Sequence, residues 1–369
     1  MNDSRRILPA DPRATYLAAK SEIDAAIQRV LASGTYILGP EVAAFEQEFA
    51  AWLGASGTVT VANGTDAIEI ALRAVGVGPG DVVATVANTV TATVAAIVAV
   101  GAEPLFVEIE PDTMLMAAPA LAQALNTPLG RRVKAVVPVH LYGLACDMPA
   151  IVEIARAHGI AVVEDCAQSH GSIVAGRMAG TWGDVAAFSF YPTKNLGALG
   201  DAGAIVSGRK DVLENARLLR QYGWRHRYVS EVHGRNSRLD ELQAAILRVR
   251  LGRLTAENTY RGALAERYLA GLQGAGLQLP VVAPGRTHTW HQFVVRTPAR
   301  DRLKAQLEQQ GIIAGVLYPV PIHQQPAYRQ DLSLPQTERA CREVLSLPLH
   351  AGLTPEDVDR VIQATRGMA

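Results

Sequence analysis

The stretch Ala186-Ala-Phe-Ser-Phe-Tyr-Pro-Thr-Lys-Asn-Leu-Gly197 decides the fold. Its apolar first half is typical of a buried strand, and Pro192 turns the chain before a single lysine, Lys194. A glycine-rich segment follows, up to Gly203, where the backbone can approach a ligand closely. Lys194 stands among apolar and small residues, and a desolvated lysine has a lowered pKa that suits an amine nucleophile. For this residue alone, a surface lysine that caps a turn is the alternative.

The composition indicates a globular chain with no strong charge bias. The 369 residues include 35 Lys+Arg and 35 Asp+Glu, a balance that argues against nucleic-acid binding. Hydrophobic residues make up 49% of the chain, and the length favours a large core divided over two domains. The apolar stretch over 90–101 falls short of the roughly 20 residues that cross a membrane, so no membrane span is expected.

The N-terminus and the cysteines both favour a cytoplasmic location. Arg5 and Arg6 are not followed by an apolar segment, so no secretory signal is expected. Cys146, Cys166 and Cys341 are widely spaced and form no Cys-x-x-Cys pattern. Such cysteines are better interpreted as buried thiols in a reducing compartment than as a disulfide or metal framework.

Strand and helix patterns alternate along the first half of the chain. Strands are predicted over 58–62, 82–86, 105–107, 133–139, 160–164 and in the apolar run from 186, and helices over 16–31, 40–53, 66–75, 91–100, 119–125 and 148–157. Alternation of this kind predicts an α/β fold with a mostly parallel sheet covered on both faces.

After Gly208 the pattern becomes largely helical. We predict helices over 211–222, 240–251, 257–272, 301–310, 336–345 and 355–365, and a strand over 291–296. These segments predict a smaller C-terminal α+β domain joined by a long helix. The expected division is a large domain over 1–252 and a small domain over 253–369.

Asn63-Gly64-Thr65 lies where a predicted strand ends and a helix begins. In a parallel α/β sheet ligands bind beyond the carboxyl ends of the strands, and a helix N-terminus attracts phosphate. An ordinary helix cap is the alternative, and for these three residues alone it is the better one.

A carboxylate, an amide and a hydroxyl complete the candidate site. Asp165 ends the strand over 160–164, and Gln168 follows three residues later. Asp165 could pair with a protonated ring nitrogen, although a turn cap explains it equally well. Ser189 precedes Lys194 on its strand and could donate a hydrogen bond to phosphate. Pyridoxal 5′-phosphate has three groups that these residues could bind: a phosphate, a ring nitrogen and an aldehyde that reacts with the lysine.

With these motifs the chain resembles the DegT/DnrJ/EryC1/StrS-type sugar aminotransferases, which act on nucleotide-linked keto-sugars and belong to the fold-type I pyridoxal phosphate enzymes. The resemblance covers nearly the whole chain. It implies a large domain with a mostly parallel seven-stranded sheet flanked by helices, and a smaller α+β domain. Its markers here are Gly39-Pro-Glu-Val, Asn63-Gly-Thr-Asp-Ala, Val139-His-Leu-Tyr-Gly, Val163-Glu-Asp-Cys-Ala-Gln, Phe188-Ser-Phe-Tyr-Pro-Thr-Lys-Asn-Leu-Gly, Asn236-Ser-Arg-Leu-Asp-Glu-Leu-Gln and Tyr318-Pro-Val-Pro-Ile-His.

The resemblance also implies residue roles. Lys194 would hold the cofactor aldehyde, Asp165 the ring nitrogen, and Gln168 the ring hydroxyl. Further contacts would come from Gly64, Thr65, Asp66 and Ser189 around the phosphate, from Asn236 of the other subunit of a homodimer with shared sites, and from Tyr318, His323 and Arg235 around the substrate. One position departs from the family pattern: Val90 stands where an aromatic residue usually covers the cofactor ring.

The segment around Lys194 resembles the branch that aminates C3 of a dTDP-3-keto-6-deoxyhexose, with L-glutamate as amino donor. A C4 aminotransferase of a 4-keto-6-deoxyhexose is the alternative within the family. The arginines between 220 and 238 suit either a solvated loop or a loop that faces the diphosphate of a neighbouring subunit's substrate. The family's dehydratase branch has histidine in place of the lysine, so Lys194 argues against it.

Two alternatives come from other classes of protein. A nicotinamide-dependent sugar oxidoreductase would need a glycine fingerprint after a strand, whereas Gly76, Gly78 and Gly80 precede one. A non-catalytic sensor would need a fused DNA-binding segment with basic charge. A metal site is not expected, because His288 and His291 have no carboxylate or cysteine close by in the sequence.

Overall fold

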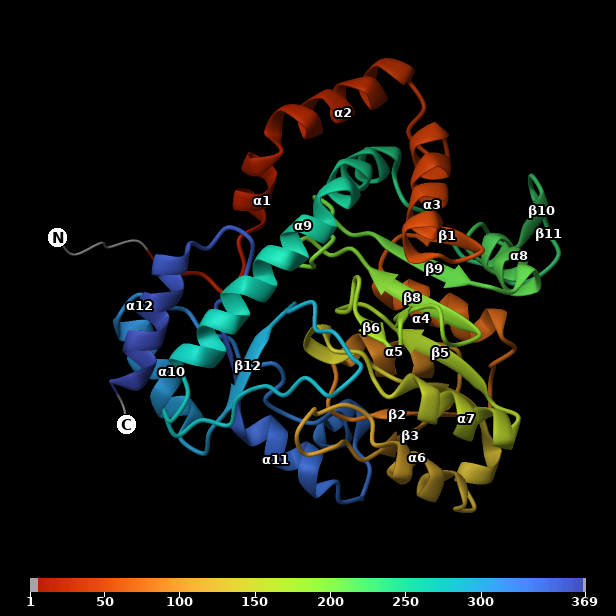
Figure 1. Ribbon diagram of the computed structural model, residues 1–369. Helices are drawn as coiled ribbons and strands as arrows, with labels where there is room; N and C mark the ends of the chain where they lie inside the picture. Colours follow the sequence, from red (N-terminus) through yellow and green to blue (C-terminus); the bar gives the residue numbers. More distant parts are fainter. Residues whose placement is uncertain (1–5, 368–369) are drawn as a thin grey trace.

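The computed structural model describes residues 6–367 and contains a seven-stranded sheet at its centre (Figure 1). The first five residues, with Arg5, and the last two residues of the predicted small domain therefore lie outside the described part. The strand order is β1 (Gly57–Val61), β9 (Gly203–Ser207), β8 (Val185–Ser189), β5 (Ala161–Asp165), β4 (Val133–Val137), β2 (Val82–Val86) and β3 (Glu103–Val107). Only β9 runs antiparallel to its neighbours. The predicted α/β class with a mostly parallel sheet is confirmed.

Side chains that alternate along each strand form two cores, one on each face of the sheet. Val82, Ala84 and Val86 of β2 belong to one core, and Val83 belongs to the other. The first core is covered by α3 (Pro40–Leu53), α6 (Ala118–Leu125) and α7 (Met148–His158). The second is covered by α4 (Gly64–Ala74), α5 (Thr91–Ala99) and α8 (Lys210–Leu219). Burial on both faces explains why the strands are near-continuous apolar runs.

The C-terminal part has its own core. The strands β12 (Phe293–Arg296) and β13 (Val344–Leu347) pair antiparallel, beside α10 (Arg300–Gln309), α11 (Pro335–Glu343) and α12 (Pro355–Arg366). Ile7, near the start of the described chain, joins this core through a bridge to Ile312. The division at 252/253 stays a prediction. Among residues 6–367, no helix is both long and apolar enough to span a membrane.

The predicted pair of helices over 240–251 and 257–272 is wrong, because one helix covers both. This helix, α9 (Glu241–Gly271), runs from beside α3 towards α10 and α12 (Figure 1). Gly252 costs a helix about 1 kcal/mol relative to alanine. The flanking Leu251 and Leu254 are buried in the sheet-side core, and their packing offsets that cost.

At the other end of the chain, the single helix predicted over 16–31 is divided at Ala19 into α1 (Pro12–Ala18) and α2 (Lys20–Ser33). Two strands, β9 and β13, carried no clear sequence signal. The first opens on the glycine-rich segment after Lys194, and the second follows directly on α11.

A buried carboxylate joins α9 to α3. The side chain of Glu241 is 1% exposed and accepts hydrogen bonds from the backbone N–H groups of Gly39, Glu41 and Val42 at 2.8, 2.9 and 2.9 Å. These are N–H groups that the first turn of a helix leaves without partners. The helix that leads to the C-terminal part thus caps the helix that covers the sheet.

We expect Glu241→Ala to lower the free energy of unfolding by about 3 kcal/mol, because three buried N–H groups would lose a charged acceptor. Denaturant titration followed by circular dichroism measures the change. As a matched control, Glu308→Ala removes a carboxylate that is 58% exposed and should change the free energy by less than about 0.5 kcal/mol. Equal stability of the two variants would contradict a capping role for Glu241.

Candidate functional site

The first turn of α4 lies against the end of β8. Asn63 is the N-cap, and its side-chain oxygen accepts the Asp66 N–H at 2.8 Å. A Cβ atom on Gly64 would lie 2.6 Å from the Cβ of Ser189, so only glycine permits this approach. The N-terminal end of α4 and the Ser189 hydroxyl therefore border the same space, where they suit a phosphate group.

Asp165 ends β5 on the carboxyl edge of the sheet and is 2% exposed. Its Oδ2 accepts the Thr93 hydroxyl at 2.8 Å, and its Oδ1 accepts the Ala167 N–H at 3.1 Å. Burial raises the pKa of Asp165, and these two hydrogen bonds offset part of the rise. Among the described residues no cationic side chain forms an ion pair with Asp165. A cation such as a protonated ring nitrogen would provide the missing charge.

Lys194 follows β8 on a tight turn, in which its N–H donates to the Tyr191 carbonyl at 2.8 Å. A Cβ atom on Gly197 would lie 2.5 Å from the Pro192 carbonyl oxygen, so the turn requires glycine there. Burial lowers the pKa of Lys194 to about 8, and the negative charge of Asp165 opposes this change. An amine with this pKa is largely protonated at neutral pH but gives up its proton readily.

Gln168 and Tyr318 are linked beside Asp165. The Gln168 oxygen accepts the Tyr142 N–H at 2.7 Å, and its amide nitrogen donates to the Tyr318 hydroxyl at 3.1 Å. Burial raises the pKa of Tyr318 to about 12, so its hydroxyl keeps its proton. These bonds hold two polar groups at the edge of the site with fixed orientation.

All of these groups line one cavity of about 360 Å³. Eight of the predicted site residues contribute to its wall, namely Gly64, Thr65, Val90, Asp165, Gln168, Ser189, Lys194 and Tyr318. Val90 is 37% exposed and offers an apolar surface without an aromatic ring. A phosphate site, a carboxylate without an ion-pair partner and an amine therefore line one cavity. These residues fit the phosphate, the ring nitrogen and the aldehyde of pyridoxal phosphate.

Three predicted residues lie on or near the segment 222–237, outside the wall of this cavity. Arg235 forms ion pairs with Asp66, at 3.1 Å, and with Glu69. Asp66 also accepts the Ser237 hydroxyl at 2.6 Å, and its N–H is taken by Asn63, so its polar groups are occupied. Asn236 is exposed and pairs through its backbone with Gln221.

His323 does not reach the cavity, contrary to the expectation that it shapes the sugar pocket. It is 1% exposed, with its ring centroid 6.2 Å from that of Phe106 and its Nε2 3.5 Å from Glu338. The neighbouring Ile322 donates its N–H to the Ala87 carbonyl, and this bond turns the segment inward. Packing of Ile322 with Ala87, Val94 and Phe106 explains the difference.

Thr93, His291 and Gln292 were not predicted as part of the site. Thr93 contacts Asp165 from the first turn of α5, and the other two residues line the cavity from the approach to β12. The helix start at Thr91, on the same edge of the sheet as Asp165, was the available signal for Thr93. His291 and Gln292 come from the C-terminal part, and no local pattern indicates that they reach Lys194.

A buried group of metal-ligand type lies behind the site. His140, Glu164 and Cys166 lie close together, but Glu164 already accepts His140 Nε2 at 3.0 Å. It also accepts the N–H groups of Gly180, Trp182 and Gly183, each at 2.8 Å. Burial would raise the pKa of Glu164, yet the bonds from His140 and the backbone outweigh it and the pKa is lowered. We interpret this group as structural, because its carboxylate is saturated.

Comparisons with known proteins agree with this geometry. Residues 18–366 match the DegT/DnrJ/EryC1/StrS aminotransferase family. The chain is 46% identical to a dTDP-3-amino-3,4,6-trideoxy-alpha-D-glucose transaminase of Streptomyces venezuelae, with 100% of this chain and 97% of the relative covered.

Two solved structures share the fold. One is DesV of S. venezuelae in complex with a ketimine intermediate, with a TM-score of 0.95, 47% identity and 98% of both chains covered. The other is NtdA of Bacillus subtilis with bound cofactor PMP, with a TM-score of 0.88, 31% identity and coverage of 98% of this chain and 86% of that one. The chain belongs to the DegT/DnrJ/EryC1/StrS aminotransferase family.

Proposed function

We propose that this chain is a pyridoxal 5′-phosphate-dependent aminotransferase that moves an amino group from L-glutamate to C3 of a dTDP-linked 3-keto-6-deoxyhexose. The observation that carries the proposal is the meeting of Lys194, Asp165 and the α4 N-terminus in one cavity. Membership of an aminotransferase family supports the reaction class and excludes the oxidoreductase alternative. The product would serve amino-deoxysugar biosynthesis.

Each side chain has a distinct task. When bound, pyridoxal phosphate supplies an aldehyde carbon that takes up the amino group and a ring that withdraws electrons. Asp165 holds a proton on the ring nitrogen, and the Thr93 hydroxyl orients the carboxylate. Lys194 takes the proton from the carbon that bears nitrogen and returns it to the acceptor carbon. Its pKa of about 8 allows the amine both to take and to release a proton near neutral pH.

The name of the S. venezuelae transaminase supports the C3 position, because the sugar in that name carries its amino group on C3. That sugar lacks the hydroxyl on C4. The 3,6-dideoxygalactose in the name of a 42% identical transaminase of Aneurinibacillus thermoaerophilus keeps it, so we propose both 4-deoxy and 4-hydroxy sugars as substrates. The cavity wall combines apolar residues such as Val90 and Leu317 with polar side chains such as Gln292 and Tyr318, and this mixture suits a deoxyhexose. The C4 aminotransferase has no comparable support.

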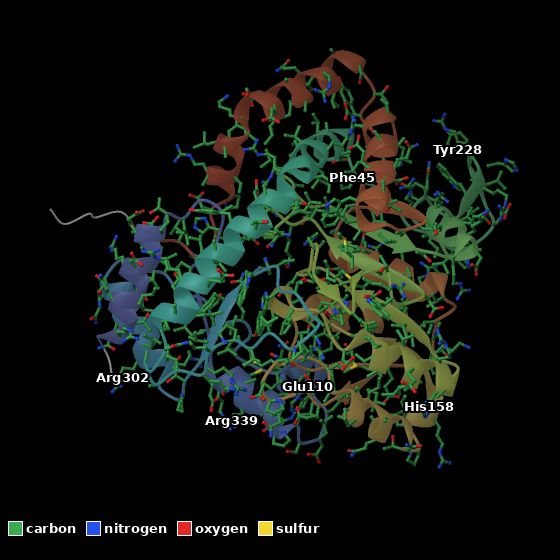
Figure 2. All side chains as sticks on the ribbon, in the orientation of Figure 1. Phe45, Glu110, His158, Tyr228, Arg302 and Arg339 are labelled. Carbon is green, nitrogen blue, oxygen red and sulfur yellow. The ribbon has the colours of Figure 1, made fainter. Side chains whose placement is uncertain are left out.

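We propose a homodimer with shared sites, and the charges of the cavity support it. None of the described residues that line the cavity is an arginine, whereas the substrates carry phosphate and carboxylate groups. The hairpin β10 (Trp224–His226) and β11 (Val229–Ser230) bears Arg225 and Arg227 and stands away from the sheet, with Tyr228 at its tip (Figure 2). We propose that this hairpin and Asn236 complete the site of a second copy, and that the enzyme works in the cytoplasm.

Lys194→Ala should reduce transamination on the order of 10⁴-fold, because the variant has no base at the reacting carbon. Borohydride should attach the cofactor covalently to the native protein at Lys194 but not to the variant, as peptide mass spectrometry would detect. Lys210→Ala, at the start of α8, is the matched control and should behave like the native protein. Full turnover by the Lys194 variant would refute the assignment.

Asp165→Asn should lower kcat on the order of 10²- to 10³-fold with little change in melting temperature, because it removes the charge that retains the ring proton but keeps the shape. Thr93→Val should lower kcat only several-fold, because one of the two hydrogen bonds to the carboxylate is lost. Steady-state kinetics measures both. If Asp165→Asn kept most of its kcat, another group would have to hold the proton on the ring nitrogen, and the assignment of Asp165 would be wrong.

The regiochemistry can be read from the reverse reaction with 2-oxoglutarate. We expect glutamate to form from dTDP-3-amino-3,4,6-trideoxyglucose or dTDP-3-amino-3,6-dideoxyhexoses, and not from dTDP-4-amino-4,6-dideoxyglucose. Coupled detection of glutamate gives the rates. Consumption of the 4-amino sugar alone would move the reaction to C4 and leave the aminotransferase assignment in place.

A further inference from the structure

His291 lines the cofactor cavity but has no place in the mechanism above. It is 5% exposed and approaches Lys194 from the segment before β12, in the C-terminal part of the chain. Its Nδ1 lies 3.2 Å from the side-chain oxygen of Asn195, the residue after Lys194. The hydrogen bonds around this pair determine which nitrogen of the ring carries the proton.

Two backbone carbonyls fix the orientation of the amides. The His170 carbonyl can only accept, and Asn258 donates to it at 2.8 Å through Nδ2. Asn258 therefore presents its oxygen to Asn195, whose Nδ2 donates to it at 2.8 Å. The same Nδ2 donates to the Thr289 carbonyl at 2.8 Å. Asn195 cannot be turned over without setting oxygen against oxygen at both contacts.

The proton of His291 follows from this chain of bonds. Because Asn195 turns its oxygen towards Nδ1, Nδ1 must carry the hydrogen, and Nε2 keeps a free lone pair. The charges nearby keep the ring neutral. Burial lowers the pKa of His291 well below its usual value, and the positive charges of Lys194 and Arg261, with the rings of His170 and His288, lower it further. Asp165 is the buried carboxylate in the same cavity wall.

Lys194 lacks a hydrogen-bond acceptor, and His291 Nε2 lacks a donor. Among the described residues none accepts a hydrogen bond from its Nζ, and none donates one to Nε2 of His291. A protonated lysine offers three donors, and a neutral imidazole offers one acceptor. Both groups face one cavity, where a flexible four-carbon side chain must be held near a single carbon atom.

We propose that His291 is a positioning residue for Lys194, whose Nζ turns to donate a hydrogen bond to His291 Nε2 once L-glutamate has displaced the lysine from the cofactor. The bond keeps the ammonium group beside the carbon to which it returns the proton. Asn195 and Asn258 hold the His291 ring in place through their hydrogen bonds. These bonds also connect the turn that carries Lys194 with the C-terminal part of the chain. This role rests on the proposed function.

Two substitutions of His291 distinguish the loss of the Nε2 acceptor from the loss of the hydrogen bond to Asn195. In His291→Asn the amide can replace Nδ1 and keep the bond to Asn195, but nothing reaches the position of Nε2. In His291→Gln the longer side chain can place an amide oxygen near that position. His288→Asn is the matched control, because His288 is a half-buried histidine three residues away that does not line this cavity.

The first readout is the pKa of Lys194, measured from the pH dependence of its acylation in enzyme treated with L-glutamate and analysed by peptide mass spectrometry. We expect His291→Asn to lower this pKa by about 1, because the charged form loses a hydrogen bond. His291→Gln and His288→Asn should leave it near the native value. In parallel, kcat of His291→Asn should fall about tenfold with KM for the sugar unchanged. An unchanged Lys194 pKa in His291→Asn would overturn the proposal.

The second readout is the tautomer of His291, observed by nitrogen NMR of the full enzyme labelled at histidine and assigned with the His291 variants. We expect a protonated Nδ1 and an unprotonated Nε2 from roughly pH 6 to pH 9. A proton on Nε2 would overturn the proposal. Neither readout needs sugar turnover, and the visible spectrum of the purified protein tests the cofactor separately, so failure of the proposed function would be seen as such.

Discussion

The site depends on one row of close backbone contacts across three strands. Gly203 opens β9 and pairs with Val61 of β1 on one side and with Ser189 of β8 on the other. A Cβ atom on Gly203 would lie 2.4 Å from the Asn63 carbonyl oxygen, and one on Gly64 would lie 2.6 Å from the Cβ of Ser189. With larger residues the first turn of α4 would be pushed away from β8. The phosphate site and the lysine turn would then no longer border the same cavity.

The two acidic residues at the end of β5 have different roles, one structural and one in the candidate site. Consecutive side chains point to opposite faces of a sheet, so Glu164 and Asp165 enter different environments. Glu164 is saturated by His140 and three backbone N–H groups. Asp165 receives two hydrogen bonds and faces the cavity without a cation. The pKa of Asp165 is raised and that of Glu164 is lowered because of this difference. Asp165, the acid without an ion-pair partner, is therefore the one that can bind a cationic group.

Local patterns predicted the parts of the fold that local forces determine. The strand over 82–86 and the helix over 40–53 were predicted at their observed bounds, because apolar runs and Gly39-Pro40 mark them clearly. The strand β9 was missed because the glycines needed for close contact weaken the strand pattern. For the site, Lys194 and Asp165 could be found since Asp165 ends a strand and Lys194 follows one, both on the edge where ligands bind. Thr93, His291 and the inward turn of His323 depend on packing between distant segments, which no local pattern contains.

The charges of the cavity explain why one chain is an incomplete enzyme in our proposal. Burial lowers the pKa of His170 to about 3, and it lowers the pKa of His291 as well, so these two rings near Lys194 are neutral at pH 7. The charged side chains of the wall are then the ammonium group of Lys194, the buried carboxylate of Asp165 and the exposed carboxylate of Asp201, and the first two are needed for the cofactor. A nucleotide diphosphate and the carboxylates of glutamate bring further negative charge, which must be balanced by cations from outside this wall. Arg235 is already paired with the buried acids Asp66 and Glu69. On the β10–β11 hairpin Arg225 has only a surface ion pair with Glu231, and Arg227 lies over the Tyr228 ring, so these exposed arginines are the cations that we propose a second copy offers.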